Sequence, residues 1–107
     1  MSRAVAFYSR VFSIEMELAG SAEHAMAFFP NPAHEVGGAL VAGRGCTPSG
    51  TGTLVYLNAG HDLGPSLLRV ADAGGRVVMG KTALGEAGFF AIILDTEGNK
   101  VALHSES

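Results

Sequence analysis

The chain carries the same succession of helical and extended patterns twice, and the second copy begins roughly 62 residues after the first. In the first copy, one amphipathic helical pattern precedes three extended patterns. In the second copy, a further extended pattern comes before the helix. Sequence identity between the copies is poor, so the repeat rests on the order of the elements. This order predicts two modules of similar architecture.

Two segments have the spacing of amphipathic helices. Residues 3–12 repeat aromatic and aliphatic side chains four positions apart, as in Phe7 and Val11, which places them on one face of a helix. Residues 62–73 form the second pattern, with Asp62 as the expected N-cap. The Gly74-Gly75 pair is expected to end this second helix because glycine accepts the backbone angles of a helix terminus.

Alternating or continuous apolar runs predict seven strands. They span residues 14–18, 25–29, 36–41, 53–59, 76–79, 89–94 and 100–104. Together with the helices, these strands predict an α+β fold of paired βαβββ modules. We expect a curved mixed sheet of about seven strands with both helices outside it.

A single domain over residues 1–107 is expected, since a chain of this length has room for one core. Module one covers residues 1–43, a glycine-rich linker covers 44–52, and module two covers 53–107. No strand pattern precedes the first helix. Either module one lacks its opening strand or the chain begins too late to include it. The missing strand leaves an unpaired sheet edge that a second copy can cover, which predicts a homodimer.

The composition argues against nucleic acid as a partner. Seven basic residues against ten acidic residues give a formal net charge of −3, so no basic binding surface is expected. Tryptophan is absent and aromatic residues make up only 7%, which leaves little for base stacking. Hydrophobic residues reach 48%, enough for a packed core.

The sequence gives no sign of a membrane span or of a disulfide. No apolar run approaches the ~20 residues that a spanning helix needs, and Cys46 is the only cysteine. We therefore expect no membrane partner and a cytoplasmic location. Cys46 lies in a loop-like segment without an adjacent base, and its role is left open.

Three short motifs together resemble the vicinal oxygen chelate superfamily, which includes glyoxalases, bleomycin-resistance proteins and ring-cleaving dioxygenases. Residues 3–13, RAVAFYSRVFS, resemble the opening helix of that family. Residues 95–101, DTEGNKV, resemble its turn before the last strand, and residues 74–77 resemble the turn after its second helix. The resemblance covers almost the whole chain and implies the paired-module fold. It does not imply one activity, because this fold carries many chemistries.

The resemblance also implies where a divalent metal would bind in family members that use one. The corresponding positions fall on or near Leu54, Leu40 and Ala102, and none of these side chains can ligate a metal. We therefore expect no metal cofactor of the family type.

Residues on two predicted strands are candidates for a ligand pocket instead. Alternation along a strand places His104 on the same face as Ala102, and places Tyr56 and Asn58 on the same face as Leu54. The expected pocket lining is Leu54, Tyr56, Asn58, Phe89, Ala102 and His104. Structural roles remain open for several of them: Tyr56 as a core residue, Asn58 as a strand-end hydrogen-bonding group, and His104 as a polar C-terminal residue.

The preferred functional hypothesis is a protein that binds a small organic molecule in a mostly apolar pocket, without a family-type metal site. The alternative is a metal-dependent lyase, isomerase or dioxygenase with a rebuilt site that uses His104 and Glu86. A third hypothesis is an interaction module in which the open sheet edge pairs with a second copy. Whether the chain is an enzyme is left open.

Overall fold

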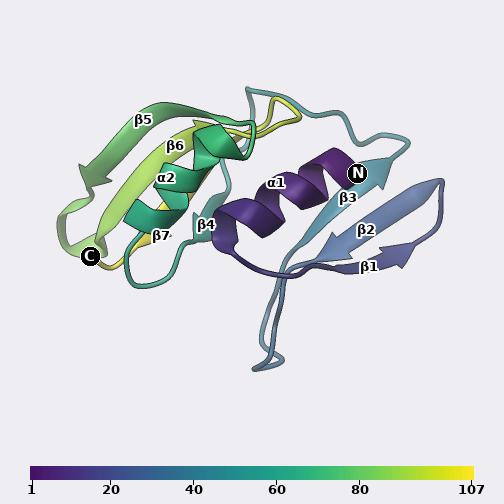
Figure 1. Cartoon of the computed structure of the whole chain (residues 1–107), viewed down its shortest axis with the longest axis horizontal. Coiled ribbons are helices and arrows are strands. Elements are labelled where there is room, and N and C mark those ends of the chain that lie inside the picture. The colour runs from purple at the N-terminus through teal and green to yellow at the C-terminus, as the bar shows by residue number, and fades with distance from the viewer.

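The computed structural model describes residues 1–107 and contains two helices and seven strands (Figure 1). Neither helix, the longer of which has 11 residues, is long and apolar enough to cross a membrane. The elements in chain order are α1 (Ser2–Phe12), β1 (Glu17–Gly20), β2 (His24–Phe28), β3 (Ala39–Gly43), β4 (Tyr56–Asn58), α2 (Gly64–Asp72), β5 (Arg76–Ala83), the short 3-10 helix η1 (Gly85–Ala87), β6 (Phe89–Leu94) and β7 (Lys100–Ser105).

The strands form two hydrogen-bonded sheets, one of three strands and one of four. The first has the order β1-β2-β3 and is antiparallel throughout. The second has the order β4-β7-β6-β5 and is mixed, because β4 runs parallel to β7. The predicted α+β class, the two helices and the seven strands are confirmed. The two sheets are not joined by a ladder, since β3 and β4 do not pair.

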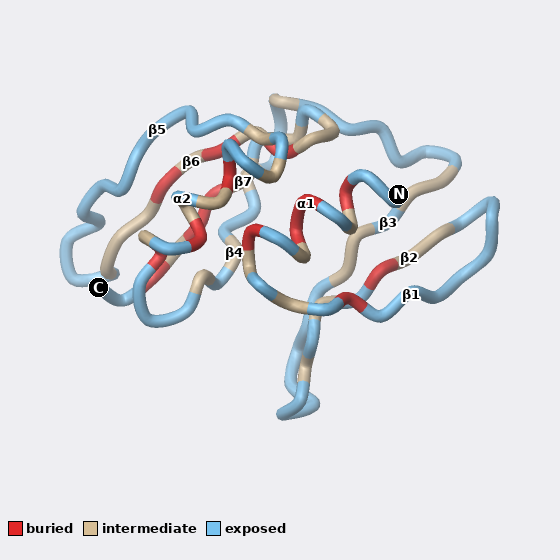
Figure 2. Tube along the Cα trace, viewed as in Figure 1, coloured by how far each residue is buried: buried red, intermediate tan, exposed pale blue.

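One core joins the two sheets and the two helices. Phe7 and Val11 of α1 are almost fully buried, and they pack in the same cluster as Val70 of α2 and Ile93 of β6. Figure 2 shows buried positions on α1, α2, β6 and β7, whereas β1 and β5 are exposed. The spacing of four along α1 therefore presents one apolar face to the core, as predicted.

A glycine allows β5 to start directly beside the first helix. A Cβ atom built at Gly75 would lie 2.5 Å from the Cε1 atom of Phe7 and 2.5 Å from the carbonyl oxygen of Leu94. Both distances are shorter than any van der Waals contact. Only a residue without a side chain fits here, so the predicted glycine turn after α2 also allows close packing.

The strand predicted over residues 14–18 begins later, at Glu17. Ser13 adopts left-handed backbone angles (φ 55°, ψ 50°) and ends α1. Met16 is buried and Ile14 packs against the core, so both belong to the connection between α1 and β1. The alternation of apolar residues here reflects burial of this connection and not ladder pairing.

Asp62 is not the N-cap of α2. That position belongs to Leu63, which makes no side-chain capping bond. The Asp62 carboxylate instead accepts hydrogen bonds from the backbone N–H of Gly64 and from Nζ of Lys81, both at 2.9 Å. Its bond to Gly64 serves the start of the helix, and its bond to Lys81 holds the long strand β5 near α2.

Candidate functional site

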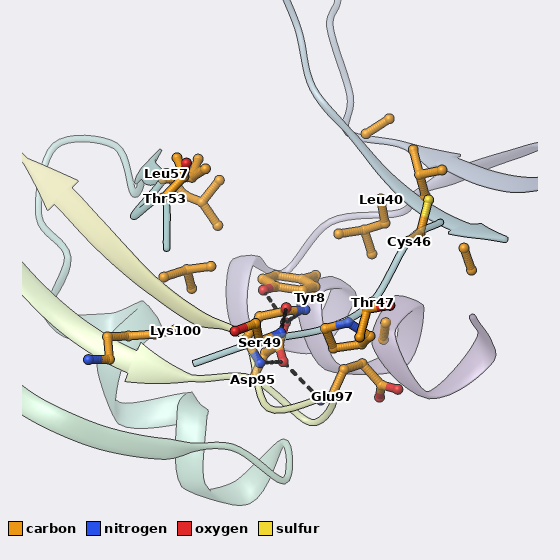
Figure 3. A pocket seen from close by; sticks show the side chains of 18 of the residues that line it. Tyr8, Leu40, Cys46, Thr47, Ser49, Thr53, Leu57, Asp95, Glu97 and Lys100 are labelled. Carbon is orange, nitrogen blue, oxygen red and sulfur yellow. Dashed lines mark hydrogen bonds between the residues drawn. The ribbon is translucent and has the colours of Figure 1, made fainter. Parts of the chain in front are cut away.

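A cavity of about 440 Å³ lies between β3 and β4, where the two sheets fail to pair. We call it the β3–β4 cavity. Residues 39–42 of β3 line one side, Leu57 and Val101 line the other, and α1 contributes Ala4 and Tyr8. Hydrophobic residues make up 12 of its 21 lining residues. Figure 3 shows Leu40 and Cys46 facing Leu57 and Thr53 across this space.

A buried hydrogen bond between Tyr8 and Asp95 forms the polar part of the wall. The Tyr8 hydroxyl donates to Oδ2 of Asp95 at 2.7 Å, and both residues are buried. Burial raises the pKa of Tyr8, and the bond to the Asp95 carboxylate raises it further. Tyr8 therefore remains a neutral hydrogen-bond donor across the physiological pH range.

The same carboxylate organises the turn between β6 and β7. Oδ1 of Asp95 accepts hydrogen bonds from the backbone N–H groups of Glu97 and Asn99, at 2.8 and 2.9 Å. Oδ1 of Asn99 accepts a hydrogen bond from the backbone N–H of Ser49 at 2.9 Å. Asn99 thus fixes the linker to the turn, and the linker residues that line the cavity are held in place.

An ion pair joins the start of α1 to this turn. Nε and Nη2 of Arg3 donate to the two carboxylate oxygens of Glu97 at 2.7 and 2.9 Å. The hydrogen bond from Arg3 is the main reason that the pKa of Glu97 falls to about 2. The Glu97 side chain keeps 19% of its exposure, so water screens the pair and its contribution to stability is modest.

This ion pair predicts a specific acid dependence of stability. Glu97 has a lower pKa in the folded protein than its ordinary value of 4.5, so its contribution is present above pH 4.5 and is lost as the pH falls toward 2. The variant Glu97→Gln is expected to lose stability less steeply across this interval. Urea denaturation at several pH values measures the slope. Equal slopes in both proteins would show that Arg3 does not shift this carboxyl.

The structure brings four of the predicted pocket residues together on one face of the four-stranded sheet. Tyr56 pairs with Ala102 and Asn58 pairs with His104 across the β4–β7 ladder. Their side chains therefore share the face on which the ring of Phe90 lies, 6.2 Å from the ring of Tyr56. None of these residues lines the β3–β4 cavity.

The remaining predicted residues lie elsewhere. Phe89 faces the opposite side of the sheet from Phe90, and Nζ of Lys81 lies 4.9 Å from its ring centroid. Leu54 precedes β4 and is half-buried. Whether the predicted residues contact a ligand stays a prediction.

Local hydrogen bonds occupy two of the polar candidates. Oδ1 of Asn58 accepts a hydrogen bond from the backbone N–H of Gly60 at 2.8 Å, which completes the end of β4. Nε2 of His104 donates to the carbonyl oxygen of Ala87. The Asn58 contact corresponds to the structural role that the sequence left open for it, whereas His104 lies within β7 and is not a frayed terminal residue.

The residues present do not fit the divalent metal of the family. No group of three or more His, Cys, Asp or Glu side chains is close enough to hold a metal ion. Of the two residues proposed for a rebuilt site, His104 already bonds to the backbone carbonyl of Ala87 through Nε2. No metal-dependent step can be derived from these side chains.

Sequence reasoning missed the cavity-lining residues Tyr8 and Asp95. Both stand in the motifs that suggested the family, yet these motifs were used there only as evidence for the fold. The useful signal was an acidic residue at the start of a tight turn, where a carboxylate commonly accepts backbone N–H bonds. Its pairing with a tyrosine 87 residues away has no local signature.

A second, more open hollow of about 750 Å³ lies beside the connection between β2 and β3. Only three of its ten lining residues are hydrophobic. The polar lining residues include Glu15, Asn31 and His34. Such a polar, open surface offers little shelter for an organic ligand. The β3–β4 cavity is therefore the stronger candidate.

Comparison with solved structures places the architecture among known proteins. No family model and no curated protein matches the sequence. A glyoxalase-related enzyme from Fulvimarina pelagi is 15% identical, with a TM-score of 0.67. The match covers 98% of this chain and 79% of that enzyme. A glyoxalase/bleomycin resistance protein/dioxygenase family enzyme from Burkholderia phytofirmans PsJN is 13% identical, with a TM-score of 0.71. This match covers 99% of this chain and 90% of that enzyme.

Glyoxalase I from Zea mays is 19% identical, with a TM-score of 0.66. The match covers 98% of this chain and only 42% of the maize enzyme. At these identities the likeness establishes architecture and not activity. The motifs at residues 3–13, 74–77 and 95–101 and the structural matches agree. The chain therefore has the fold of the glyoxalase/bleomycin resistance/dioxygenase structures, which is the fold of the vicinal oxygen chelate superfamily.

Proposed function

We propose that this chain binds a small organic molecule in the β3–β4 cavity without a family-type metal. The observation that supports this most directly is the cavity itself. Its volume of about 440 Å³ lies within the range of small-molecule sites. Its mostly apolar lining favours an organic ligand, and the Tyr8–Asp95 pair and Ser49 add a few polar groups that can orient it.

Blocking the cavity is expected to remove binding. Val55 lines the cavity and is 51% exposed, so Val55→Trp fills the space without disturbing the core. Val78 is 48% exposed and does not line the cavity, which makes Val78→Trp a matched control. Ligands found in a thermal-shift screen of organic fragments should lose affinity by about tenfold or more in the first variant only.

The same screen tests the open face of the four-stranded sheet. If Tyr56→Ala abolishes binding and Val55→Trp leaves it intact, the site is the face that carries Tyr56, Asn58, Ala102 and His104. If no fragment stabilises the protein at millimolar concentration, the proposal of a small-molecule site is wrong, because any ligand of the folded state raises its apparent stability.

The proposed absence of a metal has a direct measurement. Protein expressed without an affinity tag is expected to contain no stoichiometric nickel, zinc, iron or manganese by mass spectrometry of the elements. Near-stoichiometric metal would overturn this part of the proposal and bring forward the metal-dependent lyase, isomerase or dioxygenase alternative.

A homodimer is also proposed. Only 15 of the 107 residues are buried, although the chain is rich in apolar residues. β5, an edge strand of the four-stranded sheet, exposes Val77, Val78 and Met79, and apolar side chains on an unpaired sheet edge favour association. Sedimentation velocity across a wide concentration range distinguishes a dimer from a monomer.

A further inference from the structure

The open face of the four-stranded sheet, which carries Tyr56 and Ala102, has an apolar centre. Ladder partners share one face of a sheet, so Tyr56, Ala102 and Ile92 form a row across β4, β7 and β6. Met79 of β5 pairs with Ile92 and extends the row, and the ring of Phe90 lies 6.2 Å from that of Tyr56. Tyr56 is 47% exposed and Met79 is 44% exposed. The alternate positions of β6 and β7 belong to the core, whereas this apolar row is open to water.

Two basic residues lie at one end of the open face. Arg76 of β5 and Lys100 of β7 both pair with Leu94 of β6, so the three side chains share a face. Leu94 is two positions from Ile92 along β6, which places this group on the open face. Both basic residues are exposed, and neither takes part in an ion pair. This end of the open face therefore carries two uncompensated positive charges.

Two acidic residues lie at the other end. β5 and β7 run in the same direction, since both are antiparallel to β6. Glu86 lies in η1, which follows β5, and Glu106 directly follows β7. Nε2 of His104, on the open face, donates to the carbonyl oxygen of Ala87 and holds η1 at this end of the face. Both glutamates are exposed and neither takes part in an ion pair.

Backbone pairing along the edge of β5 is the other way in which this sheet can meet a second copy. The register of β5 on β6 shifts twice, between Val77 and Met79 and between Met79 and Thr82. Such bulges twist an edge strand and interrupt the regular row of N–H and C=O groups that a further strand needs. Lys81 adds a charge to the same edge. The open face is therefore the better contact surface.

We propose that two copies of this chain pack through the open faces of their four-stranded sheets. The two-fold axis lies between the faces and runs across the strands. It reverses the strand direction, so Arg76 and Lys100 of each copy lie over Glu86 and Glu106 of the other. The apolar row is buried between the two charged ends. This inference rests on the proposed homodimer, since it names the surface through which the copies meet, and it is independent of the β3–β4 cavity.

Reversing the charges at one end tests this arrangement. The double variant Glu86→Lys with Glu106→Lys makes both ends of the face positive, and Arg76→Glu with Lys100→Glu makes both ends negative. Each variant alone is expected to dimerise about tenfold or more weakly than the wild type, because like charges then meet. An equimolar mixture of the two is expected to form a heterodimer that salt weakens. Sedimentation velocity measures all of these associations.

Two single variants test the apolar centre. Tyr56→Glu introduces a charge into the middle of the proposed contact and is expected to weaken the dimer by about tenfold or more. Leu68→Glu is the matched control, because Leu68 is 82% exposed on α2, outside the open face. It is expected to leave the dimer intact. Circular dichroism checks that each variant is folded.

Each outcome decides the proposal. If the wild type is a monomer at every concentration, the proposed homodimer fails and this surface fails with it. If the wild type dimerises, but both double variants dimerise equally well and their mixture shows no preference, only the open-face assignment is wrong. Loss of the dimer in Leu68→Glu and not in Tyr56→Glu also overturns it. Fragment binding in the β3–β4 cavity is measured separately and does not enter these outcomes.

Discussion

The variant Asp95→Ala is expected to lower the free energy of unfolding by about 3 kcal/mol. The carboxylate accepts hydrogen bonds from the Tyr8 hydroxyl, from two backbone N–H groups of the turn, and from Nδ2 of Asn99. Its removal leaves a buried hydroxyl and two backbone donors without an acceptor. A domain of this size has a total stability of about 5–15 kcal/mol, so the loss is a large fraction of it.

Two further variants separate the contributions of this carboxylate. Tyr8→Phe removes one donor and is expected to cost about 1–2 kcal/mol, since the turn keeps its other bonds. Asp95→Asn keeps an acceptor oxygen and is expected to fall between the wild type and Asp95→Ala. Urea denaturation monitored by circular dichroism gives all three values. A loss below about 1 kcal/mol for Asp95→Ala would contradict the central role of this residue.

The variant Phe7→Ala is expected to lower the free energy of unfolding by about 3–5 kcal/mol. Phe7 is 1% exposed, and its ring packs edge-on against Tyr8 with the centroids 4.9 Å apart. The other side of the ring meets the backbone at Gly75. The removed ring leaves a space that these neighbours fill poorly, because α1 is fixed by Arg3 and Tyr8.

Phe12 supplies the matched control on the same helix. It is only half-buried, although its ring also lies near Tyr8, with the centroids 6.4 Å apart. Phe12→Ala removes the same number of atoms and is expected to cost less than half as much, because water reaches part of the site. If both alanine variants unfold at the same urea concentration, Phe7 is not the centre of the core.

Local patterns were sufficient to predict most of the secondary structure. Both helices lie where apolar residues recur at the helical spacing, and residues 89–94 form β6 within the predicted limits. The failure at residues 14–18 has a physical cause, since a buried connection and a half-buried strand alternate in the same way. The absence of a ladder between β3 and β4 depends on packing across the whole chain and has no local pattern.

The candidate site was harder to predict than the fold. Phe89 and Phe90 are adjacent, and only the register of β6 on β7 decides which ring joins Tyr56 on one face. The lining of the β3–β4 cavity comes from α1, β3, the linker, β4 and the turn after β6. Residues so far apart in the sequence come together only in the tertiary structure, so no local pattern predicts them. The resemblance to the family identified Asp95 as a turn residue, but it could not pair the residue with Tyr8.

The Tyr8–Asp95 hydrogen bond also has a consequence for the order of events during synthesis. Tyr8 is translated 87 residues before its partner Asp95. At the usual elongation rate of about 5–20 residues per second, several seconds or more pass before the carboxylate that accepts the Tyr8 hydrogen bond has been made. During that interval Phe7 and Tyr8 lack the partners on β6 and in the following turn that bury them, so α1 cannot complete its docking before residue 95 has been made.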